Sequence, residues 1–146
     1  MCEPPYEKVT SVAVVPIDPI MGHVVAVNLK DRGLDLPGGH TQVNDLDPLE
    51  TARRECAEEA SIRVGTLVLI DVIQSDFYGP GEADLTYMLI YAADAAEMLP
   101  FEANEESAGR MLVRPSEFLE GYSGHDLDSM KQWLSSALKY MDLAWT

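Results

Sequence analysis

Three glutamates, Glu55, Glu58 and Glu59, recur at spacings that place carboxylates on one side of a helix. Successive helical residues turn by about 100°, so positions i, i+3 and i+4 share a face. Near the end of a helix, these glutamates oppose the helix dipole and repel one another. A hard divalent cation such as Mg²⁺ or Mn²⁺ takes oxygen ligands and would offset both effects. The spacing therefore indicates a metal site, with a solvated acidic face as the alternative.

Arginines beside these glutamates keep the plainer interpretation open. Arg54 lies one helical turn from both Glu50 and Glu58, so it can bridge and orient carboxylates. Arg53 and Arg63 can balance the acidic charge through surface pairs, which contribute only ~0.2–0.5 kcal/mol each. From the helix alone, a metal site and a solvated face both remain open.

The segment before this helix favours close approach of a ligand. Gly38 and Gly39 follow Pro37, and without Cβ atoms they leave backbone amides and carbonyls accessible. The chain then enters the start of the helix, which is a natural setting for an anion. His40 either contacts a phosphate or lies on the surface. Gly39 and His40 are therefore candidate substrate-binding residues.

Hydrophobic patterning predicts the elements that position these residues. A helix is predicted over 48–60, with Asp47 as its N-cap and Pro48 in its first turn, and Glu50 completing a capping box. A second helix is predicted over 126–143, with a single turn at 116–119. Strands are predicted at 9–17, 23–30, 34–36, 64–73, 85–93 and 110–113. This order predicts the α+β class, with helices packed on a mixed central sheet.

Composition limits the classes of partner. The chain has 146 residues, 47% of them hydrophobic, which predicts one folded domain over 1–146. Its net charge of -15 argues against a nucleic-acid polymer as partner, because phosphate backbones need clustered cations. A small phosphate substrate stays compatible, since a divalent ion reverses the local sign. Most acidic residues are interpreted as a solubilising surface.

Cysteine use and the first residues indicate a compartment. Cys2 and Cys56 form neither a disulfide framework nor a zinc motif, which favours a reducing environment. The beginning of the chain lacks signal-peptide features, and no apolar run approaches the ~20 residues that span a bilayer. We therefore expect a cytoplasmic protein with no membrane partner.

The segment 37–62 resembles the box of the Nudix hydrolase family, which includes MutT-like proteins. The family box reads Gly, five residues, Glu, seven residues, then Arg-Glu-apolar-x-Glu-Glu-x-Gly-apolar. This chain carries Pro37-Gly38-Gly39 and then Arg54-Glu55-Cys56-Ala57-Glu58-Glu59-Ala60-Ser61-Ile62. The order of elements outside the box also suits the family. The resemblance implies an α/β/α sandwich with a mixed sheet.

Two departures from the family box bear on activity. The box is one residue too long, because the family spacing counted forward from the glycines reaches Asp45 and counted back from Arg54 reaches Leu46. The family's first glutamate is therefore absent, and since Asp47 suits the helix cap, Asp45 is the candidate for its role. Ser61 replaces the terminal glycine, which costs ~1 kcal/mol if the helix ends in a left-handed residue.

The resemblance implies a reaction and roles for residues. The reaction is hydrolysis of a nucleoside diphosphate linked to another group, a small nucleotide-like substrate, by water attack on phosphorus with Mg²⁺ or Mn²⁺ as cofactor. The metal would be held by Glu55, Glu58, Glu59 and the Gly38 carbonyl. Glu55 is a candidate general base that Arg54 orients, and Glu59 belongs to the same catalytic set.

Residues outside the box add weaker candidates. The base also comes from elsewhere in some family members, which makes Glu105 and Glu106 candidates for contact with substrate; the alternative for both is an acidic surface loop. Tyr78 is a candidate for stacking on a base, with a plain loop position as its alternative. The identity of the substrate within the diphosphate class is left open.

Three rival functions stay open at this stage. An allylic diphosphate isomerase on the same scaffold normally needs an additional cysteine, and Cys56 lies on the apolar side of the box. A nucleotide-binding or regulatory module would keep the fold without turnover. An interaction protein would use the acidic helix only as a solvated face. A homodimer through an exposed strand or the terminal helix is compatible with each.

Overall fold

The elements follow the order that the patterning predicts, with strands first, then a helix, then further strands and the helices at the end of the chain. The computed structural model describes residues 3–146. The strands in this range are β1 (Val9–Ile17), β2 (Val24–Leu29), β3 (Gly33–Asp35), β4 (Gly38–His40), β5 (Ile62–Ser75), β6 (Thr86–Met98) and β7 (Ser107–Val113). The helices are α1 (Pro48–Ala60), α2 (Pro115–Gly121) and α3 (Leu127–Tyr140), with short 3₁₀ helices at Tyr6–Lys8 and Glu82–Asp84. The predicted bounds of β1 and α1 are confirmed to the residue, whereas β5, β6 and β7 are longer than predicted.

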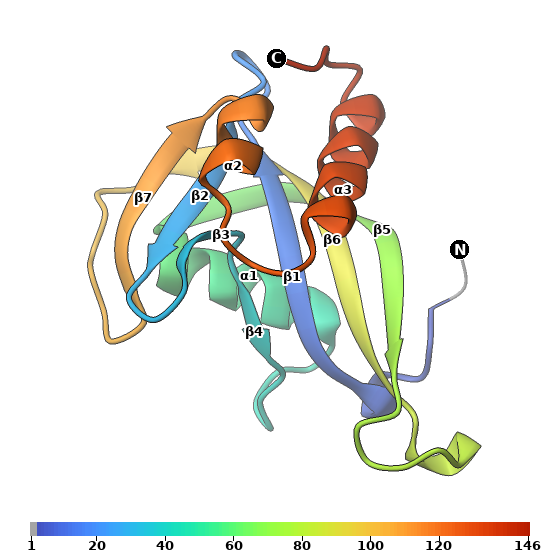
Figure 1. Cartoon of the computed structure of the whole chain (residues 1–146). Helices are drawn as coiled ribbons and strands as arrows, with labels where there is room; N and C mark the ends of the chain where they lie inside the picture. The colour runs from blue at the N-terminus through green and yellow to red at the C-terminus, as the bar shows by residue number, and fades with distance from the viewer. Residues whose placement is uncertain (1–2) are drawn as a thin grey trace.

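The strands of residues 3–146 form a single mixed sheet, and the helices pack on it (Figure 1). Its strand order is β3-β2-β1-β6-β5, with β4 paired to β1 and β7 paired to β2. The β1–β6 pair is parallel and the remaining pairs are antiparallel. The predicted α+β class is confirmed.

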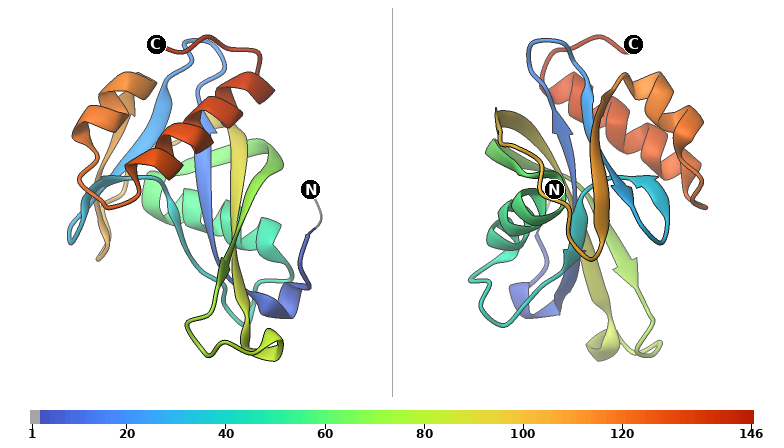
Figure 2. Two further views of the ribbon diagram at one scale, coloured as in Figure 1. Left: turned by 45° about the vertical axis from the view of Figure 1, so that its right-hand side comes forward. Right: turned by 90° about the vertical axis from the view of Figure 1, so that its left-hand side faces the viewer.

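The sheet separates two layers of helix (Figure 2). Along β1, side chains alternate between faces with a period of two. Val12 and Val14 face the core beneath α1, where Cys56 is fully buried, and Ala13 and Val15 face the core beneath α2 and α3. The predicted arrangement of helices on both faces of the sheet is confirmed.

Strand β4 corrects one prediction. No strand was predicted at 38–40, but the glycines pair with β1, with Gly38 opposite Ala13 and Gly39 opposite Val12. A Cβ on Gly38 would lie 2.9 Å from the Ala13 Cα, so only glycine allows the two backbones to approach this closely. The missing Cβ atoms therefore serve tight strand pairing, in addition to the access for a ligand that the sequence suggested.

The first turn of α1 is capped by side chains. Asp47 Oδ1 accepts the Glu50 amide at 2.9 Å, which confirms the predicted N-cap. The Glu50 carboxylate in turn accepts the Leu46 amide at 3.3 Å, so the reciprocal bond reaches one residue further back than a capping box does. These bonds fix where the helix begins.

The last turn of α1 ends in a left-handed residue, as the box pattern predicts. Ser61 has φ 52° and ψ 45°, and its Oγ accepts the Glu102 amide at 3.1 Å. A serine in this conformation costs about 1 kcal/mol relative to glycine, and the added hydrogen bond offsets a similar amount. The exchange of glycine for serine is therefore compatible with an intact helix end.

The segment 104–110 satisfies the final carbonyls of α1, which has no basic residue in its own last turn. Unpaired carbonyls at a helix end favour donors and positive charge. The bonds are Asn104 Nδ2 to the Glu58 carbonyl at 2.6 Å, Ser107 Oγ to the Glu59 carbonyl at 2.8 Å, and Arg110 Nη1 to the Ala60 and Ser61 carbonyls at 3.0 and 3.1 Å. Arg110 thus supplies the cation that the helix itself lacks.

Two features bear on compartment. No helix among residues 3–146 is long and apolar enough to cross a membrane. Cys56 is a free, buried thiol, while Cys2 lies outside the described residues.

Arg110→Met should lower the free energy of unfolding by about 2–3 kcal/mol, because charged donors to the α1 carbonyls are lost. Urea denaturation measures this loss. Arg63→Met is the control, since Arg63 pairs only with the exposed Glu97 and should cost much less. Equal losses in the two variants would contradict the capping role.

Candidate active site

Arg54 is the centre of a charged network at the C-terminal half of α1. Its Nε and Nη2 donate to the two carboxylate oxygens of Asp45 at 3.1 and 2.9 Å, a bidentate pair. Its Nη1 donates to Glu55 Oε1 at 2.9 Å and Glu58 Oε2 at 3.2 Å, and Nη2 also reaches the His40 carbonyl at 3.0 Å. One guanidinium therefore holds two helix carboxylates and the preceding loop.

Asp45 occupies the position that the overlong box left in question. Its side chain is 5% exposed and also accepts the Thr51 hydroxyl and the Gln42 amide, both at 2.9 Å. The Arg54 hydrogen bonds hold the pKa of Asp45 well below its usual range, at about 2. An aspartate one residue away from the family position thus anchors the arginine.

Two glutamates of α1 are buried where β4 crosses the helix. Glu55 is 6% and Glu59 2% exposed. The Gly38 amide donates to Glu59 Oε1 at 2.8 Å, and a Cβ on Gly39 would lie 2.6 Å from Glu55 Oε1. Both glycines are needed, one for its contact with β1 and the other for the space that Glu55 fills. Within residues 3–146, Glu59 Oε2 is the one buried side-chain oxygen or nitrogen with no hydrogen-bond partner.

Burial shapes the acidity of these carboxyls. It raises the pKa of Glu59 to about 7, an effect that the Gly38 amide opposes and the charges of Glu55 and Glu106 reinforce. Burial also raises the pKa of Glu55, against the lowering influence of Arg54. Among the box glutamates of the described residues, Glu59 is therefore the carboxylate without a cationic partner, since Arg54 pairs with Glu55 and Glu58.

Glu105 and Glu106 line a hollow of about 300 Å³ together with Glu58, Glu59 and Asn104. Asn104 Oδ1 accepts the amides of Glu106 and Ser107 at 2.9 and 2.8 Å. The same side chain donates to the end of α1, so Asn104 fastens the acidic segment against the helix. The structure thus brings these two glutamates to the box carboxylates, 46 or more residues away in sequence.

The residues present suit a hard divalent cation. Three glutamates of one helix face and Glu106 supply oxygen donors, and the unpartnered Glu59 Oε2 lies among them. Across residues 3–146, no group of three or more His, Cys, Asp or Glu side chains is arranged to hold a metal ion. Instead, Glu55 and Glu58 turn toward Arg54, and Glu59 turns toward the Gly38 amide. The donor chemistry fits, and the carboxylates are engaged by the protein's own donors.

A cavity of about 630 Å³ lies on the other side of β4. Residues of β1, β6 and α3 line it, together with Arg32, Asp35, Leu36 and residues 122–126. Gly38 and Gly39 line this cavity and also touch the buried glutamates, so β4 links the two regions. His40 lines it as well, and its backbone carbonyl accepts a hydrogen bond from Arg54, the arginine that holds Glu55 and Glu58.

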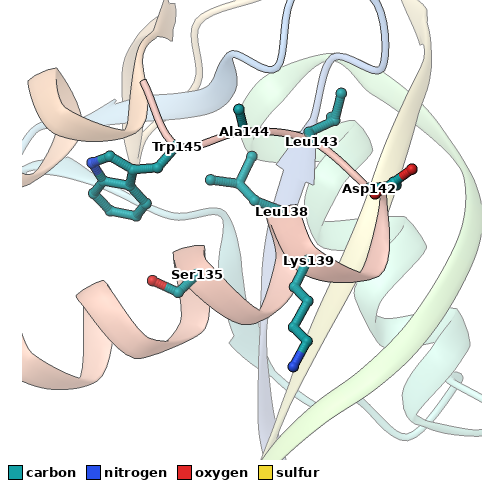
Figure 3. Close-up of a pocket in the computed structure, with 7 residues that line it drawn as sticks. All are labelled: Ser135, Leu138, Lys139, Asp142, Leu143, Ala144 and Trp145. Atoms are coloured by element: carbon teal, nitrogen blue, oxygen red, sulfur yellow. The ribbon is translucent and has the colours of Figure 1, made fainter.

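A separate hollow of about 510 Å³ lies between the C-terminal half of α3 and the segment that follows it (Figure 3). Leu138 and Trp145 give it an apolar side, and Lys139 extends away from Trp145. The residues that line it come from 135–145 and include none of the box. This hollow is therefore distinct from the acidic region.

Two candidates lie outside the site. Tyr78 is 65% exposed in the β5–β6 turn, packed edge-on against Phe77, and is not among the described residues that line the 630 Å³ cavity. Cys56 is fully buried against the sheet, and burial raises the pKa of its thiol, so it is no reactive group of the carboxylate region. Asn104 and Arg110 were not predicted, because their contacts depend on chain folding and no local pattern marks them.

Comparison with known protein families identifies the family of this chain. The family model described as "NUDIX domain" matches residues 7–134. The chain belongs to the Nudix family. The predicted family and fold are confirmed. No curated protein sequence matches the chain significantly.

Solved Nudix structures share the fold at low sequence identity. The NUDIX hydrolase from Nitrosomonas europaea is 14% identical with a TM-score of 0.69, over 94% of this chain and 93% of that chain. The NUDIX domain of Shewanella oneidensis NrtR, solved with ADP ribose, is 13% identical with a TM-score of 0.69, over 90% and 88%. The Bacillus subtilis pyrophosphohydrolase BsRppH, solved as a mutant, is 24% identical with a TM-score of 0.60, over 77% of this chain and 66% of that chain. At these identities the likeness shows the fold alone.

Asp45→Asn should lower the free energy of unfolding by about 2 kcal/mol, because it removes the carboxylate charge that anchors Arg54. Chemical denaturation measures it. Asp47→Asn in the same loop is the matched control, because asparagine caps a helix as well as aspartate. A larger loss in Asp47→Asn would contradict the assignment of Asp45.

Glu59→Gln should make the metal-free protein more stable at pH 8 by up to about 3 kcal/mol, with the gain gone near pH 4. The folded Glu59 keeps its proton until about pH 7, whereas the unfolded residue loses it near 4.5, so wild-type stability falls as pH rises between these values. Urea unfolding at several pH values in a chelating buffer tests this, with Glu58→Gln at the half-exposed neighbour as control. A difference independent of pH would refute the role of burial.

Proposed function

We propose that this Nudix protein is a metal-dependent hydrolase, with Mg²⁺ or Mn²⁺ as cofactor, that cleaves the diphosphate linkage of a nucleoside diphosphate joined to another group. The observation that supports it best is the buried, unpartnered Glu59 Oε2 beside Glu55 and Glu106. Buried charge without a counter-charge is costly, so its presence favours a cationic ligand.

Each box residue has a task in this proposal. Glu55, Glu58, Glu59 and the Gly38 carbonyl would hold the ion. Once bound, the ion would neutralise diphosphate charge, orient the attacking water and lower its pKa. The protein's remaining work is positioning and electrostatic stabilisation.

Glu55 is the proposed general base. Its pKa is raised by burial, which moves the carboxylate toward the acidity that suits proton transfer near neutral pH. Arg54 Nη1 holds Glu55 Oε1 at 2.9 Å and so fixes the direction of its carboxylate. Glu106, fastened by Asn104 next to Glu59, is the alternative base from outside the box.

The 630 Å³ cavity would receive the rest of the substrate. Gly39 and His40 lie between the carboxylates and this cavity, so they suit contact with the phosphates. We further propose a cytoplasmic setting and a homodimer through an exposed strand or the terminal helix.

A nucleotide-binding module without turnover is the second candidate. One observation favours it: the box carboxylates are engaged by Arg54 and the Gly38 amide and form no ready metal-binding group among residues 3–146. Tight nucleotide binding with no hydrolysis would be its signature.

Glu55→Gln and Glu59→Gln should each lower metal-dependent phosphate release by about 100-fold or more, because each removes a proposed ligand. The assay uses a panel of nucleoside triphosphates and diphosphate conjugates with Mg²⁺ and Mn²⁺, coupled to a phosphatase. Glu120→Gln on the exposed side of α2 is the control and should leave turnover unchanged. Full activity in both box variants would overturn the proposal.

A further inference from the structure

The carboxylate of Asp35 stands at the wall of the 630 Å³ cavity. Asp35 is the last residue of β3, and its side chain is 18% exposed. Its Oδ1 accepts the Leu36 amide at 2.7 Å. The nearest cation, Arg32 Nε, is 3.9 Å from Oδ2 on a side chain that is 62% exposed, so the ion pair is loose. Burial raises the pKa of Asp35, as expected for a carboxylate with too few donors.

Apolar side chains form one part of the cavity lining, and the charged or imidazole side chains that share it with Asp35 are exposed, namely Arg32, His40, His125 and Asp126. Met88 from β6 and Met130 from α3 line it together with Trp133. The indole of Trp133 is held in one orientation, because its Nε1 donates to Asp71 Oδ2 at 2.8 Å. Two carboxylates of the described residues line the cavity, and of these Asp35 is partly buried whereas Asp126 is exposed. The apolar side chains beside Asp35 suit a planar heterocycle, which can pack on them and present an edge to this carboxylate.

The chemistry of the carboxylate restricts that edge. An ionised carboxylate only accepts hydrogen bonds, and its two oxygens suit two parallel donors. A 2-amino-4-oxopyrimidine edge has a ring N–H next to an exocyclic amine, as in guanine and pterins. Adenine places its amine beside an acceptor nitrogen, and uracil flanks its N–H with two carbonyls. These edges would oppose acceptors to an acceptor.

We propose that Asp35 is a specificity-determining residue that selects substrates carrying a 2-amino-4-oxopyrimidine ring, as guanine nucleotides and pterin phosphates do. The inference rests on the proposed function, since it places the ring of the substrate in the cavity and its phosphates across β4 at the glutamates. Gly39, which lines the cavity and touches Glu55, is the point where the two parts meet.

Isothermal titration calorimetry with GMP, IMP, AMP and pterin tests the proposal without turnover. IMP differs from GMP only in lacking the exocyclic amine. Wild-type protein should bind GMP about tenfold more tightly than IMP, and AMP more weakly than either. Asp35→Asn, which keeps the shape of the side chain, should reduce the GMP-to-IMP ratio to near one. Asp31→Asn is the matched control, because Asp31 is 79% exposed and does not line the cavity.

The outcomes separate this inference from the proposed hydrolase. Equal wild-type affinity for GMP and IMP, an unchanged ratio in folded Asp35→Asn, or no binding of any of the four probes would overturn it. Pterin binding that depends on Asp35 would assign the edge to pterins as well as to guanine. Metal-dependent hydrolysis of GTP and ITP with equal kcat/KM would reject base selection and leave the hydrolase standing. Selective GMP binding without hydrolysis would reject the hydrolase and leave the role of Asp35 standing.

Discussion

The guanidinium of Arg54 is the contact on which the geometry of the site depends. Carboxylates one helical turn apart repel one another, and this single cation lies between them while its other edge is fixed by Asp45. Because Arg54 also holds the His40 carbonyl, the loop that leads from β4 to α1 is tied to the helix face. The strand that carries the glycines and the helix that carries the glutamates are thereby kept in register.

Acidic residues at the end of α1 also place a demand on the rest of the chain. The helix ends with negative charge where its dipole favours positive charge, and the compensating donors come from Asn104, Ser107 and Arg110. The segment that stabilises the helix end is the segment that carries Glu105 and Glu106. Stability of the helix and assembly of the acidic hollow are therefore properties of the same contacts.

Local signals in the sequence predicted the elements well and the site in part. The Asp47 cap defined the start of α1, the run of β-branched residues at 9–17 defined β1, and the glutamate spacing defined the acidic face. Strand β4 was missed because glycines carry no strand preference, and the contacts that require them, with β1 at Gly38 and with Glu55 at Gly39, exist only in the folded chain. The cavity around Asp35 was out of reach for a different reason, since its walls come from segments more than 100 residues apart. For Asp45, the sequence suggested the role of the missing box glutamate, but its partner Arg54 was evident only from the folded loop.

Direct titration with Mn²⁺, followed by the loss of the free-ion signal in electron paramagnetic resonance, tests the central claim that the α1 carboxylates bind a divalent cation. Wild-type protein is expected to remove Mn²⁺ from solution at a saturable site. The double variant Glu55→Gln, Glu59→Gln, verified as folded, is expected to leave the free-ion signal unchanged. Saturable binding of equal strength in both proteins, or none in the wild type, would contradict the account.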